Sequence, residues 1–242
     1  MNIAIIGYGK MGKTIEKIAT NRNHNIQLCY DKTPNKNILL NNSIDIVIEF
    51  SQPYSAFENI KICIENNIPV VSGTTGWLQQ LNEIKNICIK NNGSFLYSSN
   101  FSISMNIFYE INKKLSILLL PFSKKYDISI KEIHHKEKKD KPSGTALHIA
   151  NDIINIGMKN YWNTIDNKKK LIKNYKKSIL IESKRCENVI GEHIVDYKSN
   201  IEKISIKHKA YSRNIFAIGA IISAEWLINK KGFFSMKDML GL

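Results

Sequence analysis

The chain has 242 residues, 43% of them hydrophobic, and a formal net charge of +14. This length can bury one good core or two modest ones, and no apolar run approaches the roughly twenty residues of a membrane-spanning helix, so no membrane partner is expected. The lysines are spread along the chain rather than gathered on one helix, which argues against nucleic acid as the partner.

The first predicted strand covers residues 2–6, a continuous apolar run that leads into a glycine-rich turn. Gly7 permits the tight turn, Gly9 lets the backbone approach a pyrophosphate, and Gly12 allows close packing of helix on strand. Residues 14–19 then have a helical pattern. This order of strand, glycine turn and helix is the one that dinucleotide binding requires.

A second predicted strand, residues 26–30, ends in Asp31, about twenty residues after Gly12. At that spacing a carboxylate accepts hydrogen bonds from the adenosine ribose hydroxyls. Lys32 could also tolerate the 2′-phosphate of NADP, so the cofactor is NADH or NADPH.

Strands and helices alternate over the next fifty residues, which predicts a doubly wound parallel sheet. The expected strands are residues 45–50, 69–72 and 93–97, and the expected helices are residues 53–66 and 81–89. Ligands of such sheets bind beyond the carboxyl ends of the strands, so the loops 73–75 and 98–101 are expected to line the cofactor cleft. Ordinary loops contain the same residue types, so composition alone does not assign them.

The pattern changes after a helix at residues 104–119 that Pro121 ends. A strand at residues 127–133 leads to a histidine-rich loop and a helix reaching about residue 156. Residues 159–177 are polar, lysine-rich and without clear period, so we expect a surface excursion. Three further strands, residues 178–182, 188–195 and 201–207, predict an open mixed sheet that favours subunit association.

An apolar helix at residues 214–228 and the terminal residues 232–242 are expected to return to the first domain. The predicted fold class is therefore α/β, a Rossmann-type parallel sheet domain plus an α+β substrate domain with an open mixed sheet. The first domain takes residues 1–101 with 214–242 and binds the dinucleotide. The second, residues 102–213, binds the substrate and carries the oligomer contacts.

The stretch from residue 131 to residue 149 concentrates the chemistry of the chain. His134 and His135 would face opposite sides of a regular strand, so both serve one pocket only if the strand breaks there. Lys138 can return to that pocket through the loop. A histidine pair in a lysine-rich loop can also be merely solvated.

A turn at residues 142–145 follows, in which Ser143 or Thr145 can cap the next helix. The free N–H groups of that helix favour a carboxylate or phosphate, which implies an anionic substrate. No third His, Cys or carboxylate stands at ligand spacing nearby, so no metal is expected. The four cysteines form no Cys-x-x-Cys pair, which fits a reducing cytoplasm.

Several motifs together resemble the 4-hydroxy-tetrahydrodipicolinate reductase family, also called dihydrodipicolinate reductases. The matching segments are Glu132-Ile-His-His135, Lys138, Asp140, Pro142-Ser-Gly-Thr-Ala146, Gly73-Thr-Thr75, Asn100-Phe-Ser102, Gly191-Glu-His193, His208-Lys-Ala210, Arg213, Phe216-Ala-Ile-Gly-Ala220 and Met236-Lys-Asp-Met-Leu240. The resemblance implies reduction of a cyclic imine carrying two carboxylates, with NADH or NADPH and with loss of water, in lysine biosynthesis through diaminopimelate. It also implies a homotetramer.

The resemblance assigns the site residues as well. His134 and Lys138 match the proton donors. The substrate-binding matches are His135, Ser143, Gly144 and Thr145. The cofactor-binding matches are Gly7, Tyr8, Gly9, Lys10, Met11, Gly12, Asp31, Lys32, Gly73, Thr74, Thr75, Ser98, Ser99, Asn100 and Phe101. The glycine turn is one residue shorter than the commoner family form, and Asp31-Lys32 replaces Glu-Arg, so the choice of cofactor stays open.

Two other functions fit parts of the chain. The first domain would equally support another nicotinamide-dependent dehydrogenase, acting on a small anionic amino or imino acid. A non-enzymatic dinucleotide sensor or a basic RNA-binding module would tolerate replacement of His134 and Lys138, whereas a reductase would lose turnover.

Overall fold

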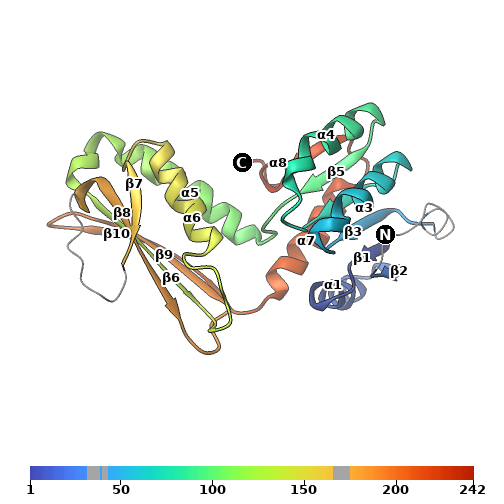
Figure 1. Ribbon diagram of the computed structural model, residues 1–242, viewed down its shortest axis with the longest axis horizontal. Coiled ribbons are helices and arrows are strands. Elements are labelled where there is room, and N and C mark those ends of the chain that lie inside the picture. Colours follow the sequence, from blue (N-terminus) through green and yellow to red (C-terminus); the bar gives the residue numbers. More distant parts are fainter. Residues whose placement is uncertain (32–38, 40–42, 166–174) are drawn as a thin grey trace. The chain divides into compact units, whose positions relative to one another are not determined.

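The structure is a computed structural model that describes residues 1–31, 39, 43–165 and 175–242. The predicted cofactor residue Lys32 and residues 166–174 of the predicted excursion lie outside these residues. The chain forms two compact units: unit 1 comprises Met1–Asn106 and Asn214–Leu242, and unit 2 comprises Ile107–Arg213 (Figure 1). Within the described residues, no helix combines the length and the hydropathy needed to cross a membrane.

Unit 1 is built on a six-stranded sheet in the order β11-β5-β4-β3-β1-β2, with every neighbouring pair parallel. The strands are β1 (Asn2–Ile6), β2 (Asn25–Tyr30), β3 (Ile46–Glu49), β4 (Val70–Ser72), β5 (Ser94–Tyr97) and β11 (Gly232–Ser235). The predicted Rossmann-type parallel sheet is confirmed.

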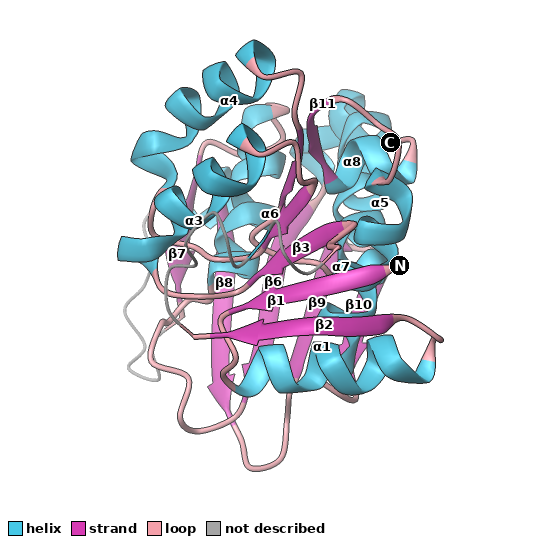
Figure 2. Ribbon diagram, turned by 90° about the vertical axis from the view of Figure 1, so that its right-hand side faces the viewer, coloured by secondary structure: helices cyan, strands magenta, loops and turns pink. Residues whose placement is uncertain are grey.

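Helices cover both faces of this sheet, because successive strand residues point to opposite faces. They are α1 (Lys10–Asn21), α3 (Pro53–Glu65), α4 (Leu81–Lys90), α7 (Asn214–Leu227) and α8 (Met236–Leu240), with a 3₁₀ turn η1 (Leu78–Gln80). Ile3 and Ile5 of β1 pack in one core with α1 and α7, whereas Ala4 and Ile6 pack in the other with α3 and α4 (Figure 2).

Helix α1 begins four residues earlier than predicted, at Lys10 with Gly9 as its N-cap. The helix therefore contains Gly12, a residue that the sequence pattern had placed before it. A Cβ on Gly12 would lie 2.3 Å from the carbonyl oxygen of Gly7. Gly7 itself has φ +91°, and a Cβ there would lie 2.1 Å from the carbonyl oxygen of Phe50. Both glycines are thus required by close backbone packing.

Unit 2 contains a five-stranded sheet in the order β10-β9-β6-β8-β7. The strands are β6 (Asp127–His134), β7 (Tyr161–Thr164), β8 (Ser178–Arg185), β9 (Gly191–Lys198) and β10 (Lys203–Ala210). The β10-β9-β6 pairs are antiparallel and the β6-β8-β7 pairs are parallel. The predicted mixed sheet is confirmed.

Two helices lie side by side on one face of the second sheet, α5 (Ile103–Leu119) and α6 (Gly144–Asn155) (Figure 1). Their contact includes the rings of Tyr109 and His148, 4.3 Å apart. Buried Tyr197 of β9 anchors α5, because its hydroxyl lies 2.7 Å from both Ser116 Oγ and Asn112 Oδ1. Short 3₁₀ turns complete the unit, η2 (Leu120–Lys125) and η3 (Tyr175–Lys177).

The prediction that residues 159–177 lack regular structure is wrong at its start. Tyr161–Thr164 forms β7, which pairs in parallel with β8 at the edge of the sheet. No residue of β7 is fully buried. Because the strand has no buried face, its sequence need not alternate polar and apolar residues, and the pattern that indicates a strand is missing. Residues 166–174 lie outside the described part of the chain.

Candidate active site

The glycine turn of unit 1 borders a hollow of about 340 Å³, lined by Gly7, Gly9, Asp31, Phe50, Ser51, Gln52, Tyr54 and Ser55. A Cβ on Gly9 would meet no atom within 4 Å, so the backbone here is open to a close-fitting ligand. Asp31 accepts the backbone N–H of Tyr8, which holds the carboxylate beside the glycine turn. A glycine cradle next to an oriented carboxylate fits the pyrophosphate and ribose of a dinucleotide.

The other predicted residues of the fingerprint have different surroundings. Tyr8 donates its hydroxyl to Glu16, and this hydrogen bond, followed by burial, raises the pKa of the tyrosine to about 12. Lys10 is exposed at the start of α1, and Met11 packs against the core that β1 forms with α1 and α7. Only the backbone of this segment therefore borders the hollow, at Gly7 and Gly9.

The loop after β4 is held by a buried carboxylate, that of Glu49. Glu49 accepts hydrogen bonds from Ser72 Oγ at 2.6 Å and from Thr74 Oγ1 at 2.9 Å. A Cβ on Gly73 would lie 2.2 Å from the Phe50 ring, so this glycine is required by packing. Of the predicted residues here, Thr75 is the exposed one.

The loop after β5 is closed by its own hydrogen bonds. Ser98 Oγ lies 2.9 Å from the carbonyl oxygen of Asn100 and also accepts the Asn100 N–H. Phe101 is buried, with its ring 5.7 Å from that of Phe50, while Ser99 is exposed. Gly73 to Thr75 and Ser98 to Phe101 thus lie at the carboxyl ends of neighbouring strands but do not line the hollow with Gly7.

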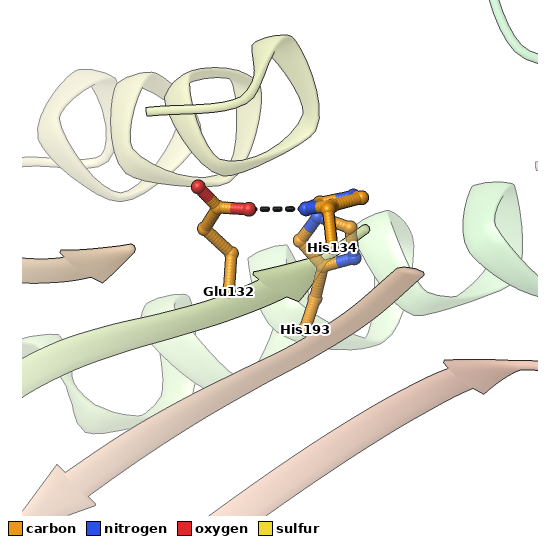
Figure 3. A group of neighbouring side chains, drawn as sticks. All are labelled: Glu132, His134 and His193. Carbon is orange, nitrogen blue, oxygen red and sulfur yellow. Dashed lines mark hydrogen bonds and ion pairs between the residues drawn. The ribbon is translucent and has the colours of Figure 1, made fainter. Parts of the chain in front are cut away.

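In unit 2 the buried face of β6 carries a carboxylate and an imidazole two residues apart, Glu132 and His134. The Nδ1 atom of His134 is hydrogen-bonded to Glu132, and the ring of His193 on β9 lies 5.0 Å from that of His134 (Figure 3). A Cβ on Gly191 would lie 3.2 Å from His134 Nε2, so this glycine leaves room for the imidazole.

Arg185 of β8 ties this cluster to the loop that follows β6. Its Nη1 lies 2.9 Å from Glu132 Oε1. The same guanidinium donates to the carbonyl oxygens of Lys138 at 3.2 Å and Asp140 at 2.5 Å. One planar side chain therefore holds a buried carboxylate and two loop carbonyls together.

Electrostatics fix the protonation states of two residues in the cluster. Burial alone raises the pKa of Glu132, but hydrogen bonds from His134 and Arg185 outweigh it and lower the pKa to about 2. Burial, followed by the charge of His134, lowers the pKa of His193 to about 3. Near neutral pH, Glu132 is therefore a carboxylate and His193 is uncharged.

Lys138 and the first turn of α6 converge on one carboxylate. Lys138 Nζ lies 2.7 Å from Asp140 Oδ1, and the backbone N–H of Gly144 lies 3.3 Å from Asp140 Oδ2. Burial alone raises the pKa of Asp140, but the hydrogen bond and charge of Lys138 keep it below its ordinary value. The predicted anion site, a lysine beside a helix N-terminus, is therefore present. In this structure its anion is the Asp140 carboxylate of the chain itself.

Of the two predicted capping candidates, Ser143 and Thr145, it is Ser143 that caps α6, by accepting the N–H of Ala146 at 3.2 Å. The same hydroxyl lies 3.3 Å from His193 Nε2, so the cap joins the helix to the imidazole cluster. Thr145 is half-buried in the first turn. The Nδ1 atom of His193 is buried and has no hydrogen-bond partner among the described residues.

The two adjacent histidines, His134 and His135, have different surroundings, because β6 ends between them. The imidazole of His135 accepts a hydrogen bond from Arg213 Nη2 at 3.1 Å. Both residues line a second hollow of about 450 Å³ that also includes Lys136, Glu137 and residues 187–190. Arg213 is a site candidate that the sequence had supplied only as part of the family resemblance.

The statement that no third metal ligand lies near the histidines is wrong in three dimensions. Ligand atoms of Glu132, His134 and His193 all lie within 4.8 Å of one another. Sequence spacing does not reveal this group, because His193 lies on another strand, far along the sequence from Glu132 and His134. Arg185 already neutralises Glu132 at 2.9 Å, and a guanidinium so close opposes a cation.

Comparisons with known proteins point to one family. The family model described as "Dihydrodipicolinate reductase, N-terminus" matches residues 1–101, and "Dihydrodipicolinate reductase, C-terminus" matches residues 104–240. A 4-hydroxy-tetrahydrodipicolinate reductase of Christiangramia forsetii is 45% identical over 240 residues, 99% of this chain and 98% of that protein. The protein of the same name from Buchnera aphidicola is 41% identical, covering 90% of this chain and 82% of its own length.

A solved structure has the same fold. Dipicolinate-bound dihydrodipicolinate reductase from Paenisporosarcina sp. TG-14 superposes with a TM-score of 0.75, at 22% sequence identity and with 97% of each chain covered. The resemblance found in the sequence motifs is confirmed.

Proposed function

Because the chain belongs to the 4-hydroxy-tetrahydrodipicolinate reductase family, we propose that it reduces 4-hydroxy-tetrahydrodipicolinate to tetrahydrodipicolinate, with loss of water. This reaction serves lysine biosynthesis through diaminopimelate. The reductant is NADH or NADPH, which when bound supplies the hydride. Gly7, Gly9 and Asp31 would hold it, since they combine an open backbone cradle with an oriented carboxylate.

The observation that carries the proposal is the environment of His134. Reduction of a conjugated imine creates a basic position that must take up a proton, so a nearby cationic acid lowers the barrier. Glu132 engages Nδ1 of His134, which leaves Nε2 to exchange a proton with the substrate. The hydrogen bond to the Glu132 carboxylate also fixes the orientation of the ring. Lys138 is the second proton donor.

The substrate carries two carboxylates, and unit 2 offers cationic partners for them. Lys138 and the N–H groups of Gly144 and Thr145 receive one carboxylate in place of Asp140, to which Lys138 and Gly144 are bonded in this structure. Ser143 keeps this helix end in place as its cap. His135 would contact the substrate from the second hollow, which it lines with Arg213. Hydride transfer requires that the nicotinamide ring reach the bound substrate.

Turnover with substrate generated by a coupled synthase, run separately with NADH and with NADPH, tests the proposal. We expect His134→Gln to lower turnover about 100-fold or more, and Lys138→Ala about tenfold or more. The matched controls are His148→Gln on the exposed side of α6 and Lys139→Ala at an exposed position of the same loop as Lys138. Full activity of His134→Gln would refute the assignment. Turnover with a small amino or keto acid, but not with the cyclic imine, would point to another dehydrogenase.

We further propose that the protein works in the cytoplasm as a homotetramer. The free state of all four cysteines fits a reducing compartment. The edge position of β10 supports association of subunits, because an outer strand leaves one row of backbone groups without partners in its own sheet. Light scattering coupled to size-exclusion chromatography measures the assembly, and a monomer at micromolar concentration would contradict it.

A further inference from the structure

Tyr54 is the second residue of α3 and exposes 87% of its surface. It nevertheless lines the hollow beside Gly7, Gly9 and Asp31. No ring contact or hydrogen bond joins its side chain to another residue in the part of the chain that the structure describes. A large aromatic ring held in water beside a binding hollow is available to stack on a ligand.

Two other tyrosines of unit 1 are engaged by neighbouring side chains. Tyr8 donates its hydroxyl to Glu16, and Tyr97 packs edge-on against the ring of Trp77, 5.7 Å away. Tyr54 differs from both. Its backbone is fixed, because Pro53 opens the helix just before it and the N–H of Ser55 bonds back to Gln52 at 3.0 Å. A rigid mount lowers the entropy lost when the ring binds a partner.

The surroundings of the hollow indicate which part of a dinucleotide reaches Tyr54. The glycine cradle accommodates the pyrophosphate, and Asp31 accepts the hydroxyls of the adenosine ribose. The adenine base is bonded to that same ribose, so it lies within the reach of residues that share the hollow with Asp31. Among these residues, Tyr54 and Phe50 carry aromatic rings, and the Phe50 ring is packed against Phe101.

We propose that the Tyr54 ring stacks on the adenine of the bound cofactor. The inference rests on the proposed function only in taking a nicotinamide dinucleotide as the ligand. Stacking of one base on an aromatic side chain strengthens binding about 5- to 100-fold, and it does not depend on a 2′-phosphate. Tyr54 therefore contributes equally to NADH and NADPH.

Calorimetric titration with ADP-ribose, which has the adenine end but no nicotinamide, tests this directly. We expect Tyr54→Ala to weaken binding about tenfold, and Tyr54→Phe to bind within about twofold of the wild type, because the ring remains. Tyr211→Ala is the matched control, since Tyr211 is 83% exposed and lies in unit 2. Equal ADP-ribose affinity of Tyr54→Ala and wild type would overturn the inference.

A second readout uses reduced nicotinamide mononucleotide, which lacks the adenine. Turnover with this reductant should be the same for wild type and Tyr54→Ala, while the KM for NADH rises in the variant. A loss of turnover with the mononucleotide would show a general structural effect and overturn the stacking role. If Tyr54-dependent ADP-ribose binding persists in a protein that does not reduce the cyclic imine, this inference stands and the proposed function falls.

Discussion

His193 should make the stability of unit 2 depend on pH. Burial, followed by the charge of His134, lowers its pKa from 6.5 to about 3. As the pH falls below 6.5, the unfolded chain binds a proton on this side chain that the folded chain does not, so stability decreases. For this one residue, linkage gives a loss of about 2 kcal/mol between about pH 7 and about pH 5.

His193→Gln removes the titrating group, so the variant should lose about 2 kcal/mol less than the wild type over that interval. Glu132 does not interfere, because its pKa is lowered from 4.5 to about 2 and its contribution is lost only below pH 4.5. Burial also lowers the pKa of His208, but that contribution is common to both proteins and cancels in the difference.

Urea unfolding at a series of pH values measures the effect. The chain has three tryptophans, and Trp162 is the one in unit 2, so its ¹⁹F resonance after 5-fluorotryptophan labelling reports on that unit alone. His148→Gln is the control, because His148 is half-exposed on α6. If His193→Gln and wild type lose the same stability at every pH, the imidazole is not buried in its neutral form and the reasoning fails.

Two further substitutions test the geometry of the site. Gly191→Ala should lower turnover about tenfold with the fold intact, because the new Cβ crowds His134 Nε2 at 3.2 Å. Single-turnover kinetics measure the loss of turnover, and a melting curve checks the fold. Unchanged kinetics would mean that the ring tolerates displacement. Asp140→Asn should tighten binding of pyridine-2,6-dicarboxylate about two- to fivefold, because a competing carboxylate is lost from Lys138. Weaker binding in that titration would show instead that Asp140 positions Lys138.

Much of unit 1 could be predicted because its signals are local. A buried parallel strand is a short apolar run, and β1, β3, β4 and β5 all have this form. The start of α1 was missed because a glycine at position 12 looks like turn, whereas close packing against Gly7 places it inside the helix. β7 was missed because an edge strand without a buried face has no period to detect.

The candidate site also contains residues that local sequence predicts and residues that it does not. Local sequence predicts His134, Lys138 and Ser143, because they lie within ten residues of one another and their residue types indicate their chemistry. The partners that orient them depend on sheet register instead. His193 stands opposite Glu132 in the antiparallel β6–β9 pair, and Arg185 stands opposite His134 in the parallel β6–β8 pair. Neither register follows from a single sequence, because strand order is set by the packing of the whole unit.

Arginine is rare in this chain, since of 35 basic residues only Arg22, Arg185 and Arg213 are arginines. Two of them do what a lysine cannot. Arg22 donates to Glu225 from two nitrogens, Nε at 3.0 Å and Nη2 at 2.8 Å. Arg185 divides its donors between the buried Glu132 and two loop carbonyls. A planar fork of donors explains both positions, whereas a single ammonium could not make either set of contacts.

Arg213 has the same fork but no carboxylate partner among the described residues, and its Nη2 instead donates to the His135 imidazole. The pair lines a hollow of about 450 Å³, so the guanidinium charge borders open space. Under the proposed function, the substrate supplies the missing charge. With one substrate carboxylate at Lys138, we propose Arg213 as the partner of the other, because the bidentate geometry of a guanidinium suits a carboxylate better than a lysine does.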